Sequence, residues 1–191
     1  MGELLLRPLT VDDEAAARAA HEELAADDFA FLLAQRREEG AAPETWAEYA
    51  ARLEDQRHGR RLDPGFVPAS FLVAEVDGVI VGRASVRHEL NEFLAVWGGH
   101  IGYGVRPAYR RRGHAPAILR GCLALCADLG IGPDEVIAFG DMPNDIPMLS
   151  WAGRSWAMAD AHPTVVEVAD EVAPGHEEDG VARVLAGVFD L

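Results

Sequence analysis

Residues 99–130 combine a strand-like segment, a basic turn and an apolar helix-like segment, in that order. Gly102 and Gly104 alternate with apolar residues, the period of two that a half-buried strand shows. The turn contains Gly113, and a run with helical periodicity begins near Pro116. Unpaired N–H groups at the start of a helix attract anions, and arginines in the preceding turn add positive charge. This order of features predicts a site for a phosphate-bearing ligand, held mainly by main-chain groups.

The sequence of this turn resembles a known cofactor loop. Arg110-Arg111-Arg112-Gly113-His114-Ala115 fits the pattern (Gln/Arg)-x-x-Gly-x-(Gly/Ala), the pyrophosphate loop of the GNAT superfamily of acetyl-CoA-dependent N-acetyltransferases. The surrounding segment, residues 70–115, is similar to one GNAT branch almost continuously. The alternative is a basic surface turn before an ordinary core helix. The resemblance implies acetyl-CoA as co-substrate, bound by Tyr103, Gly104, Val105, Arg110, Arg111, Arg112, Gly113, His114, Ala115 and, near the start of a later helix, Asn144.

The composition is that of a globular protein with an acidic surface. The 191 residues carry a formal net charge of −15, which argues against a nucleic-acid or membrane partner. The arginines between Arg106 and Arg112 therefore form a local positive island. Cys122 and Cys126 lie one helical turn apart, and we interpret both as small core residues in a reducing compartment. The sequence shows neither a signal peptide nor a long apolar span, so a cytoplasmic location is expected.

Before the cofactor segment, the pattern predicts one strand and two helices. Leu4–Leu6 form a short apolar strand, and Thr10 followed by acidic residues is typical of a helix start. That helix is expected to run toward Gly40, with a break near Asp27, and a second helix opens at Pro43. Its aromatic residues recur at helical spacing, so we expect them in the core. GNAT proteins place two helices here, often near the acceptor substrate.

A predicted hairpin precedes the cofactor strand. Residues 71–75 and 79–87 are rich in β-branched residues and are joined by Asp77-Gly78, a strong hairpin signal. The polar cluster that follows contains three candidate bases for removing a proton from an amine: Glu89, Glu92 and His88. In the similar GNAT branch a matching segment lies near the acceptor side. The alternative interpretation is a solvated loop with capping roles.

The tail, from residue 131, closely resembles a different superfamily, the C-terminal end of haloacid-dehalogenase (HAD) phosphatases. Gly140-Asp141-x-x-Asn144-Asp145 matches the fourth motif of that family, in which acidic side chains hold Mg²⁺. Under this alternative, Asp141 and Asp145 are the metal ligands; otherwise we predict no metal site. HAD chemistry also needs an aspartate nucleophile in an Asp-x-Asp motif. The nearest match, beginning at Glu75, has glutamate at that position and lies in the predicted hairpin.

These patterns predict an α/β (α+β) fold, with a mixed, mostly antiparallel twisted sheet flanked by helices. The tail supplies a strand at 135–139, a helix at 143–152 and a strand at 155–158. We therefore expect a single GNAT-like domain over residues 1–191, in which residues 1–130 hold the acetyl-CoA site. Residues 131–191 are expected to complete its sheet.

The leading hypothesis is direct transfer of an acetyl group from acetyl-CoA to an amine of a small molecule or peptide. Main-chain N–H groups near Tyr103–Val105 would polarise the thioester carbonyl. Pro116 has no N–H to offer a phosphate, and the tail contains no tyrosine to protonate the CoA thiolate. The alternatives are a Mg²⁺-dependent HAD-type phosphatase and a non-catalytic CoA-binding remnant. A homodimer is compatible with either activity, and the acidic surface suggests a cationic acceptor.

Overall fold

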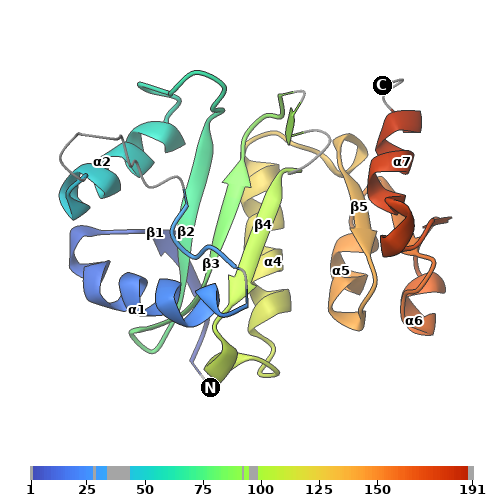
Figure 1. Cartoon of the computed structure of the whole chain (residues 1–191), viewed down its shortest axis with the longest axis horizontal. Coiled ribbons are helices and arrows are strands. Elements are labelled where there is room, and N and C mark those ends of the chain that lie inside the picture. The colour runs from blue at the N-terminus through green and yellow to red at the C-terminus, as the bar shows by residue number, and fades with distance from the viewer. Residues whose placement is uncertain (1, 28, 34–43, 92, 95–98, 189–191) are drawn as a thin grey trace. The chain divides into compact units, whose positions relative to one another are not determined.

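The chain divides into two compact units in a computed structural model that describes residues 2–27, 29–33, 44–91, 93–94 and 99–188 (Figure 1). The first unit comprises Met1–Asn91 and His100–Cys122, and the second comprises Glu92–Gly99 and Leu123–Leu191. Helix α4 (His114–Asp128) begins in the first unit and ends in the second. Each unit is described by itself below. None of the described helices is long and apolar enough to cross a membrane.

The first unit is built on a four-stranded antiparallel sheet with the order β1-β2-β3-β4. The strands are β1 (Leu5–Pro8), β2 (Ala69–Val76), β3 (Val79–Arg87) and β4 (Ile101–Val105). Asp77 and Gly78 both have positive φ angles, 50° and 79°, as a tight two-residue hairpin turn requires. The predicted hairpin and the predicted cofactor strand are therefore confirmed.

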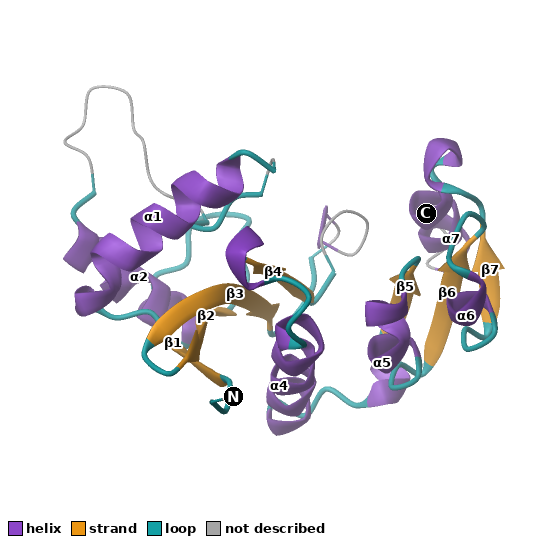
Figure 2. Cartoon of the chain, turned by 90° about the horizontal axis from the view of Figure 1, so that it is seen from below, coloured by secondary structure: helices purple, strands orange, loops and turns teal. Residues whose placement is uncertain are grey.

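Helices cover both faces of this sheet. Figure 2 shows α1 (Glu14–Ala25) and α2 (Trp46–Arg57) on one side and α4 on the other. Thr45 caps α2, because its hydroxyl accepts from the Glu48 N–H at 3.3 Å while the Glu48 carboxylate accepts from the Thr45 N–H at 2.9 Å. Helix α1 ends at Ala25, short of the predicted run toward Gly40, and residues 34–43 lie outside the described part.

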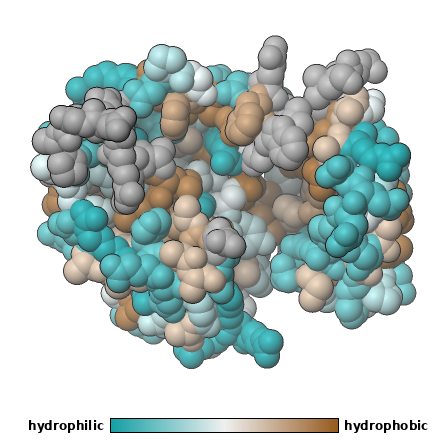
Figure 3. Space-filling view, viewed as in Figure 1, coloured by the Kyte–Doolittle hydropathy of each residue, from teal (hydrophilic) through white to brown (hydrophobic). Residues whose placement is uncertain are grey.

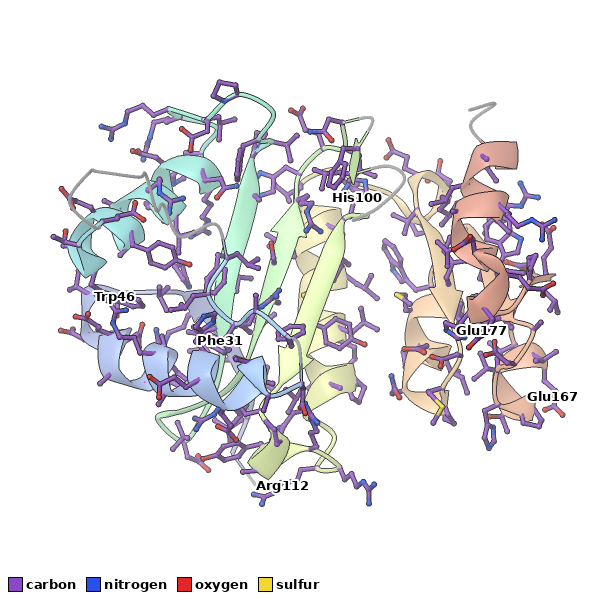
Figure 4. The ribbon with its side chains drawn as sticks, viewed as in Figure 1. Phe31, Trp46, His100, Arg112, Glu167 and Glu177 are labelled. Carbon is purple, nitrogen blue, oxygen red and sulfur yellow. The ribbon has the colours of Figure 1, made fainter. Side chains whose placement is uncertain are left out.

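The core between α1, α2 and the sheet is aromatic and aliphatic. Phe31 is fully buried and meets Phe71 of β2 edge-on, and Trp46 packs at 5.5 Å from the Tyr49 ring (Figure 4). The aromatic residues of α2 are thus core residues, as predicted. A short 3-10 turn, Pro107–Tyr109, connects β4 to α4. Cys122 and Cys126 of α4 are fully buried, in agreement with their predicted role as small core residues.

The second unit contains a three-stranded parallel sheet with the order β5-β6-β7. Its strands are β5 (Ile137–Gly140), β6 (Arg154–Met158) and β7 (Glu171–Ala173), and its helices are α5 (Ile146–Leu149), α6 (Pro163–Val166) and α7 (Gly180–Val188). Ala138 and Ala157 pack with residues of α5 and α6, whereas the stacked rings of Phe139 and Trp156 face residues of α7. Hydrophilic residues predominate on the side of this unit that faces the viewer, where exposed Glu177 lies (Figures 3 and 4).

The tail strands do not complete the first sheet, so this expectation is wrong. Strand β5 pairs with β6 and forms a separate parallel sheet, and the chain divides into two units where one domain was expected. The physical reason is that the tail's strand–helix–strand units satisfy their own hydrogen bonds. Helices on both faces of this sheet also bury the apolar side chains that point to either face. The predicted strands and helix of the tail are otherwise found close to their predicted positions.

Gly153 is a sensitive position of the second unit. A Cβ there would lie 2.6 Å from the carbonyl oxygen of Pro133 and 2.7 Å from the Cα of Asp134, both main-chain atoms. We expect Gly153→Ala to destabilise this unit by about 2 kcal/mol, since the main chain must shift. In Gly187→Ala the Cβ meets nothing within 4 Å, so the stability is unchanged or raised by up to about 1 kcal/mol. Hydrogen exchange of the β6 amides measures both, and equal effects would contradict the packing argument.

Candidate functional site

Strand β4 is the outer strand of the first sheet. The N–H and carbonyl groups of its successive residues point alternately toward β3 and away from it. The Arg87 N–H donates to the His100 carbonyl at 2.8 Å, and the Arg106 N–H donates to the Val81 carbonyl at 2.9 Å. In an antiparallel ladder, these bonds direct the main-chain groups of even-numbered residues of β4 toward β3. Tyr103 and Val105 therefore direct their N–H and carbonyl groups toward the outer edge. A ligand lying along this edge meets main-chain groups, as the cofactor hypothesis requires.

The turn after β4 ends at the start of a long helix. Arg111 and Gly113 have positive φ angles of 60° and 78°, which bend the chain sharply into α4, a helix of 15 residues. A Cβ at Gly113 would meet nothing within 4 Å, so the space next to this glycine is open. The N–H groups of the first turn lie at the positive end of the helix dipole, except at Pro116, which has none. This geometry fits a bound pyrophosphate.

Two arginines of the turn are occupied by carboxylates of the first unit. Arg106 donates to Glu23 at 2.7 Å and to the Ile80 carbonyl, and Arg110 donates to Asp27 at 2.6 Å and to the Val105 carbonyl at 3.1 Å. These contacts hold the turn against the end of α1. Arg110 thus positions the loop in this structure, whereas its predicted contact with the cofactor stays a prediction.

The other two arginines of the turn are exposed. Arg111 and Arg112 form no ion pair within the described ranges, and the Arg112 guanidinium lies 5.6 Å from the Tyr109 ring centre (Figure 4). Their charges remain available to an anion at the helix start. His114, the first residue of α4, is buried, and Ala115 follows it in the first turn.

The candidate bases lie beyond the opposite end of β4. Because β3 and β4 are antiparallel, with Val86 opposite Ile101, residues that follow β3 are near the start of β4. His88 is half-buried and its Nε2 lies 2.9 Å from the Ser70 hydroxyl. Burial, followed by nearby positive charge, lowers the pKa of His88 below its ordinary value. Its imidazole is therefore neutral at neutral pH.

Glu89 and Glu92 differ in what the structure says of them. Glu89 is exposed in the bend after β3, and Glu92 lies outside the described residues. The five residues of β4 span about 14 Å at ordinary strand rise. His88 and Glu89 thus lie beyond one end of this strand, and the turn that contains Gly113 follows its other end.

The buried arginine on β3, Arg83, was not predicted from the sequence as a site residue. Arg83, opposite Gly104, is only 5% exposed. It donates to the carbonyls of Ala30 at 2.8 Å and Gly102 at 3.3 Å, whereas its Nε has no hydrogen-bond partner. Burial, followed by repulsion from Arg87, lowers its pKa to about 10. The signal was the period of two in Arg83, Ser85 and Arg87, which puts three polar side chains on one face of a buried strand.

The phosphatase alternative predicted a metal site in the second unit. Asp145 accepts from the main-chain N–H groups of Asp141 and Met142, each at 3.1 Å, and from the Asn144 amide at 2.9 Å. Burial raises the pKa of Asp145 despite these bonds. Within the described residues, no group of three or more His, Cys, Asp or Glu side chains could hold a metal ion. The Asp145 carboxylate thus bonds within its own turn.

Two residues singled out in the sequence, Asn144 as a cofactor contact and Glu75 as the nearest match to a HAD nucleophile, lie in different units. Asn144 lies in the second unit and its amide is bound to Asp145, whereas the anion-binding turn lies in the first unit. Its predicted cofactor role rested on a continuous sheet that is not formed. Glu75, the residue nearest to a HAD nucleophile in sequence, lies in β2, where its carboxylate accepts from Arg7 Nε at 2.8 Å.

The antiparallel sheet, with helices on both faces and a turn that leads from its outer strand into a long helix, places the first unit among mixed α/β proteins, and comparison with known families gives the family. Residues 14–146 match the acetyltransferase (GNAT) family, and the chain belongs to this family. Residues 119–185 match the haloacid dehalogenase-like hydrolases. The two matches overlap in residues 119–146, a range that contains the predicted boundary at residue 131.

Individual relatives mostly match the second half of the chain. A phosphoglycolate phosphatase of Methanopyrus kandleri is 44% identical over 71 residues, which are 37% of this chain and 31% of that protein. A phosphoglycolate phosphatase of Halorubrum lacusprofundi is 38% identical over 102 residues, which are 51% of this chain and 43% of that protein. The chain thus spans less than half of either relative. Among solved structures, RimJ of Mycobacterium smegmatis in complex with CoA-disulfide has a TM-score of 0.44 at 22% identity, covering 66% of this chain and 57% of that one.

Proposed function

We propose that this chain transfers an acetyl group from acetyl-CoA to an amine of a small molecule or peptide. The observation that carries the proposal is the turn around Gly113. It joins an outer strand, whose main chain points along its edge, to the start of a long helix, within a segment that belongs to the GNAT family. The open space at Gly113 and the exposed Arg111 and Arg112 suit a pyrophosphate.

In the proposed reaction, an amine nitrogen attacks the carbonyl carbon of the thioester. A C–N bond forms, the C–S bond breaks, and the thiolate leaves and takes up a proton. Main-chain N–H groups near Tyr103 and Val105 stabilise the negative charge that develops on the carbonyl oxygen. His88, which burial keeps neutral, or Glu89 accepts the proton that the ammonium form must lose, directly or through water.

The test is release of free CoA thiol from acetyl-CoA in the presence of a panel of amines. We expect thiol release that depends on the amine and persists in a chelator, because no step uses a metal. His88→Gln is expected to lower the rate by about 10²-fold or more if His88 is the base, within the usual range for general-base loss. Binding of acetyl-CoA without turnover of any amine would instead support a non-catalytic CoA-binding chain.

A second candidate function is phosphate-ester hydrolysis, favoured by the 44% identity of 71 residues to a phosphoglycolate phosphatase. The described acidic residues include no group of three or more that could hold a metal ion, and the nearest match to the Asp-x-Asp motif of HAD proteins begins with Glu75, in the hairpin of the first unit. Phosphate release from phosphoglycolate in the presence of Mg²⁺, lost in Asp141→Ala, would favour this function over acetyl transfer.

A further inference from the structure

We propose that Arg83 binds a carboxylate of the amine acceptor, so that the preferred acceptors are amino acids or other amines that carry a carboxylate. This inference rests on the proposed acetyl transfer. It names a specificity residue on β3 rather than a cofactor contact. The site consists of Arg83, the glycines opposite and diagonal to it on β4, and the ring of Phe29.

The first observation is a buried charge without a counter-ion in the described part of the chain. Arg83 is 95% removed from solvent, and its hydrogen bonds go only to two neutral carbonyls. Its Nε–H has no acceptor, although the atom is fully buried. A charge in such surroundings is strongly unfavourable unless an anion joins it.

The second observation is that several less buried arginines of this unit are paired with carboxylates. Arg7 is paired with Asp13 and Glu75, Arg52 with Glu44, Arg106 with Glu23 and Arg110 with Asp27. Arg83 is more buried than any of these, and among the described residues it forms no ion pair. Carboxylates thus accompany guanidinium groups that are less buried than Arg83, and the partner of Arg83 is inferred to come from a ligand.

The third observation is the position of Arg83 beside the middle of β4. It pairs with Gly104 and contacts Ala30 and Phe29, on the face that α1 and α2 cover. The neighbouring Gly82 instead points toward Ile118 of α4, since its Cβ would lie 3.2 Å from that side chain. Arg83 is therefore on the sheet face opposite α4. An acceptor anchored there is next to the strand along which the thioester is proposed to lie.

The geometry favours a small planar anion. The Phe29 ring lies 4.4 Å from the guanidinium carbon and directly against Gly104, where a Cβ would come within 2.4 Å of the ring. The Nε–H and one N–H of the neighbouring terminal nitrogen of a guanidinium point in the same direction. Together they can donate two parallel hydrogen bonds to one carboxylate. Phe29, which is only half-buried, must turn aside for such a ligand to enter. Arg87, on the same strand face, adds positive potential.

The test compares acceptors that differ only in the carboxylate. Amino acids and the corresponding amino-acid amides are offered to the wild type with acetyl-CoA, and thiol release is followed. We expect kcat/KM to be about 10- to 100-fold higher for the carboxylates, the usual range for a charged hydrogen bond. Arg83→Met should remove this preference by lowering kcat/KM for the acids and leaving the amides within about twofold. Arg18→Met removes an exposed arginine of α1 and serves as the control that keeps the preference.

Each outcome is decisive. Equal rates for acids and amides would overturn the role of Arg83 and leave acetyl transfer intact, and so would a preference for phosphorylated amines. If no amine is acetylated, the proposed function fails. Binding of N-acetyl amino acids and of their amides to the wild type, measured by thermal shift, then decides the inference about Arg83 alone. The same binding measurement applies if Arg83→Met does not fold. A shift with the acids only supports the site, and no difference overturns it.

Discussion

Gly113→Glu is expected to raise the dissociation constant of acetyl-CoA at least 100-fold. The substitution puts a carboxylate into the open space next to Gly113, at the start of α4, where the pyrophosphate is proposed to lie. Like charges at such a distance repel by several kcal/mol, and each 1.4 kcal/mol is a factor of about ten in affinity. A glutamate immediately before the first turn interacts favourably with the helix dipole, so the charge itself should not weaken α4. Calorimetric titration of acetyl-CoA measures the effect.

Gly130→Glu is a closely matched control for this variant. Gly130 has a φ angle of 81°, against 78° for Gly113, and its Cβ would also meet nothing within 4 Å. The backbone strain of a non-glycine residue is therefore similar, but Gly130 follows the other end of α4. We expect this variant to bind acetyl-CoA as the wild type does. Equal losses in both variants would indicate a folding defect, and no loss in Gly113→Glu would mean that the turn is not the pyrophosphate site.

The features that the sequence predicted well are local in the chain. The hairpin around Asp77-Gly78 follows from two residues with positive φ angles between β-branched runs. The order of β4, turn and α4 follows from a change of period at Gly113. Each depends on contacts between residues that are close in sequence, for which periodicity and turn chemistry are direct indicators.

The arrangement of the tail could not be predicted in the same way, because sheet membership depends on distant pairings. The strand at Ile137–Gly140 has the same local pattern whether it pairs with β4 or with β6. The junction was also hidden, since the two family matches overlap within α4 and its continuation. An apolar helix with buried Ile118 and Cys126 suits either fold, so helical periodicity does not reveal where one resemblance gives way to the other.

The net charge is distributed unevenly along the chain, and the cationic acceptor inferred from it stays a prediction. Residues 123–191 contain 13 acidic residues and two arginines, so most of the charge of −15 belongs to the tail. Residues 1–122, which hold the proposed acetyl-CoA site, are close to neutral with 19 acidic residues and 15 arginines. The argument for a cationic acceptor therefore does not apply to the first unit. Its local feature is the buried Arg83, which favours a carboxylate.

The largest expected loss of stability in the first unit is that of Asp13→Asn. The Asp13 carboxylate accepts from two nitrogens of Arg7, at 2.7 and 2.8 Å, and from the N–H and hydroxyl of Thr10, at 2.7 and 2.8 Å. Its side chain is only 10% exposed. An amide of the same shape leaves no cavity, but it turns at least one acceptor into a donor that faces other donors. Breaking a largely buried ion pair in this way should lower the free energy of unfolding by about 3 kcal/mol. This value is at the low end of the usual range because Arg7 keeps its ion pair with Glu75.

The pH dependence separates this network from a general packing defect. The hydrogen bonds from Arg7 lower the pKa of Asp13 from 3.8 to about 2, so the folded state holds the carboxylate charged more firmly than the unfolded state does. The resulting stabilisation is present above the unfolded pKa, amounts to about 2 kcal/mol, and is lost as the pH falls through about 2. Wild type and variant should therefore converge in acid, whereas Asp12→Asn, at an exposed neighbour, should change stability by less than about 0.5 kcal/mol. Hydrogen exchange of the β2 and β3 amides reports this unit alone, and a difference that persisted undiminished to pH 2 would contradict the Arg7–Asp13 explanation.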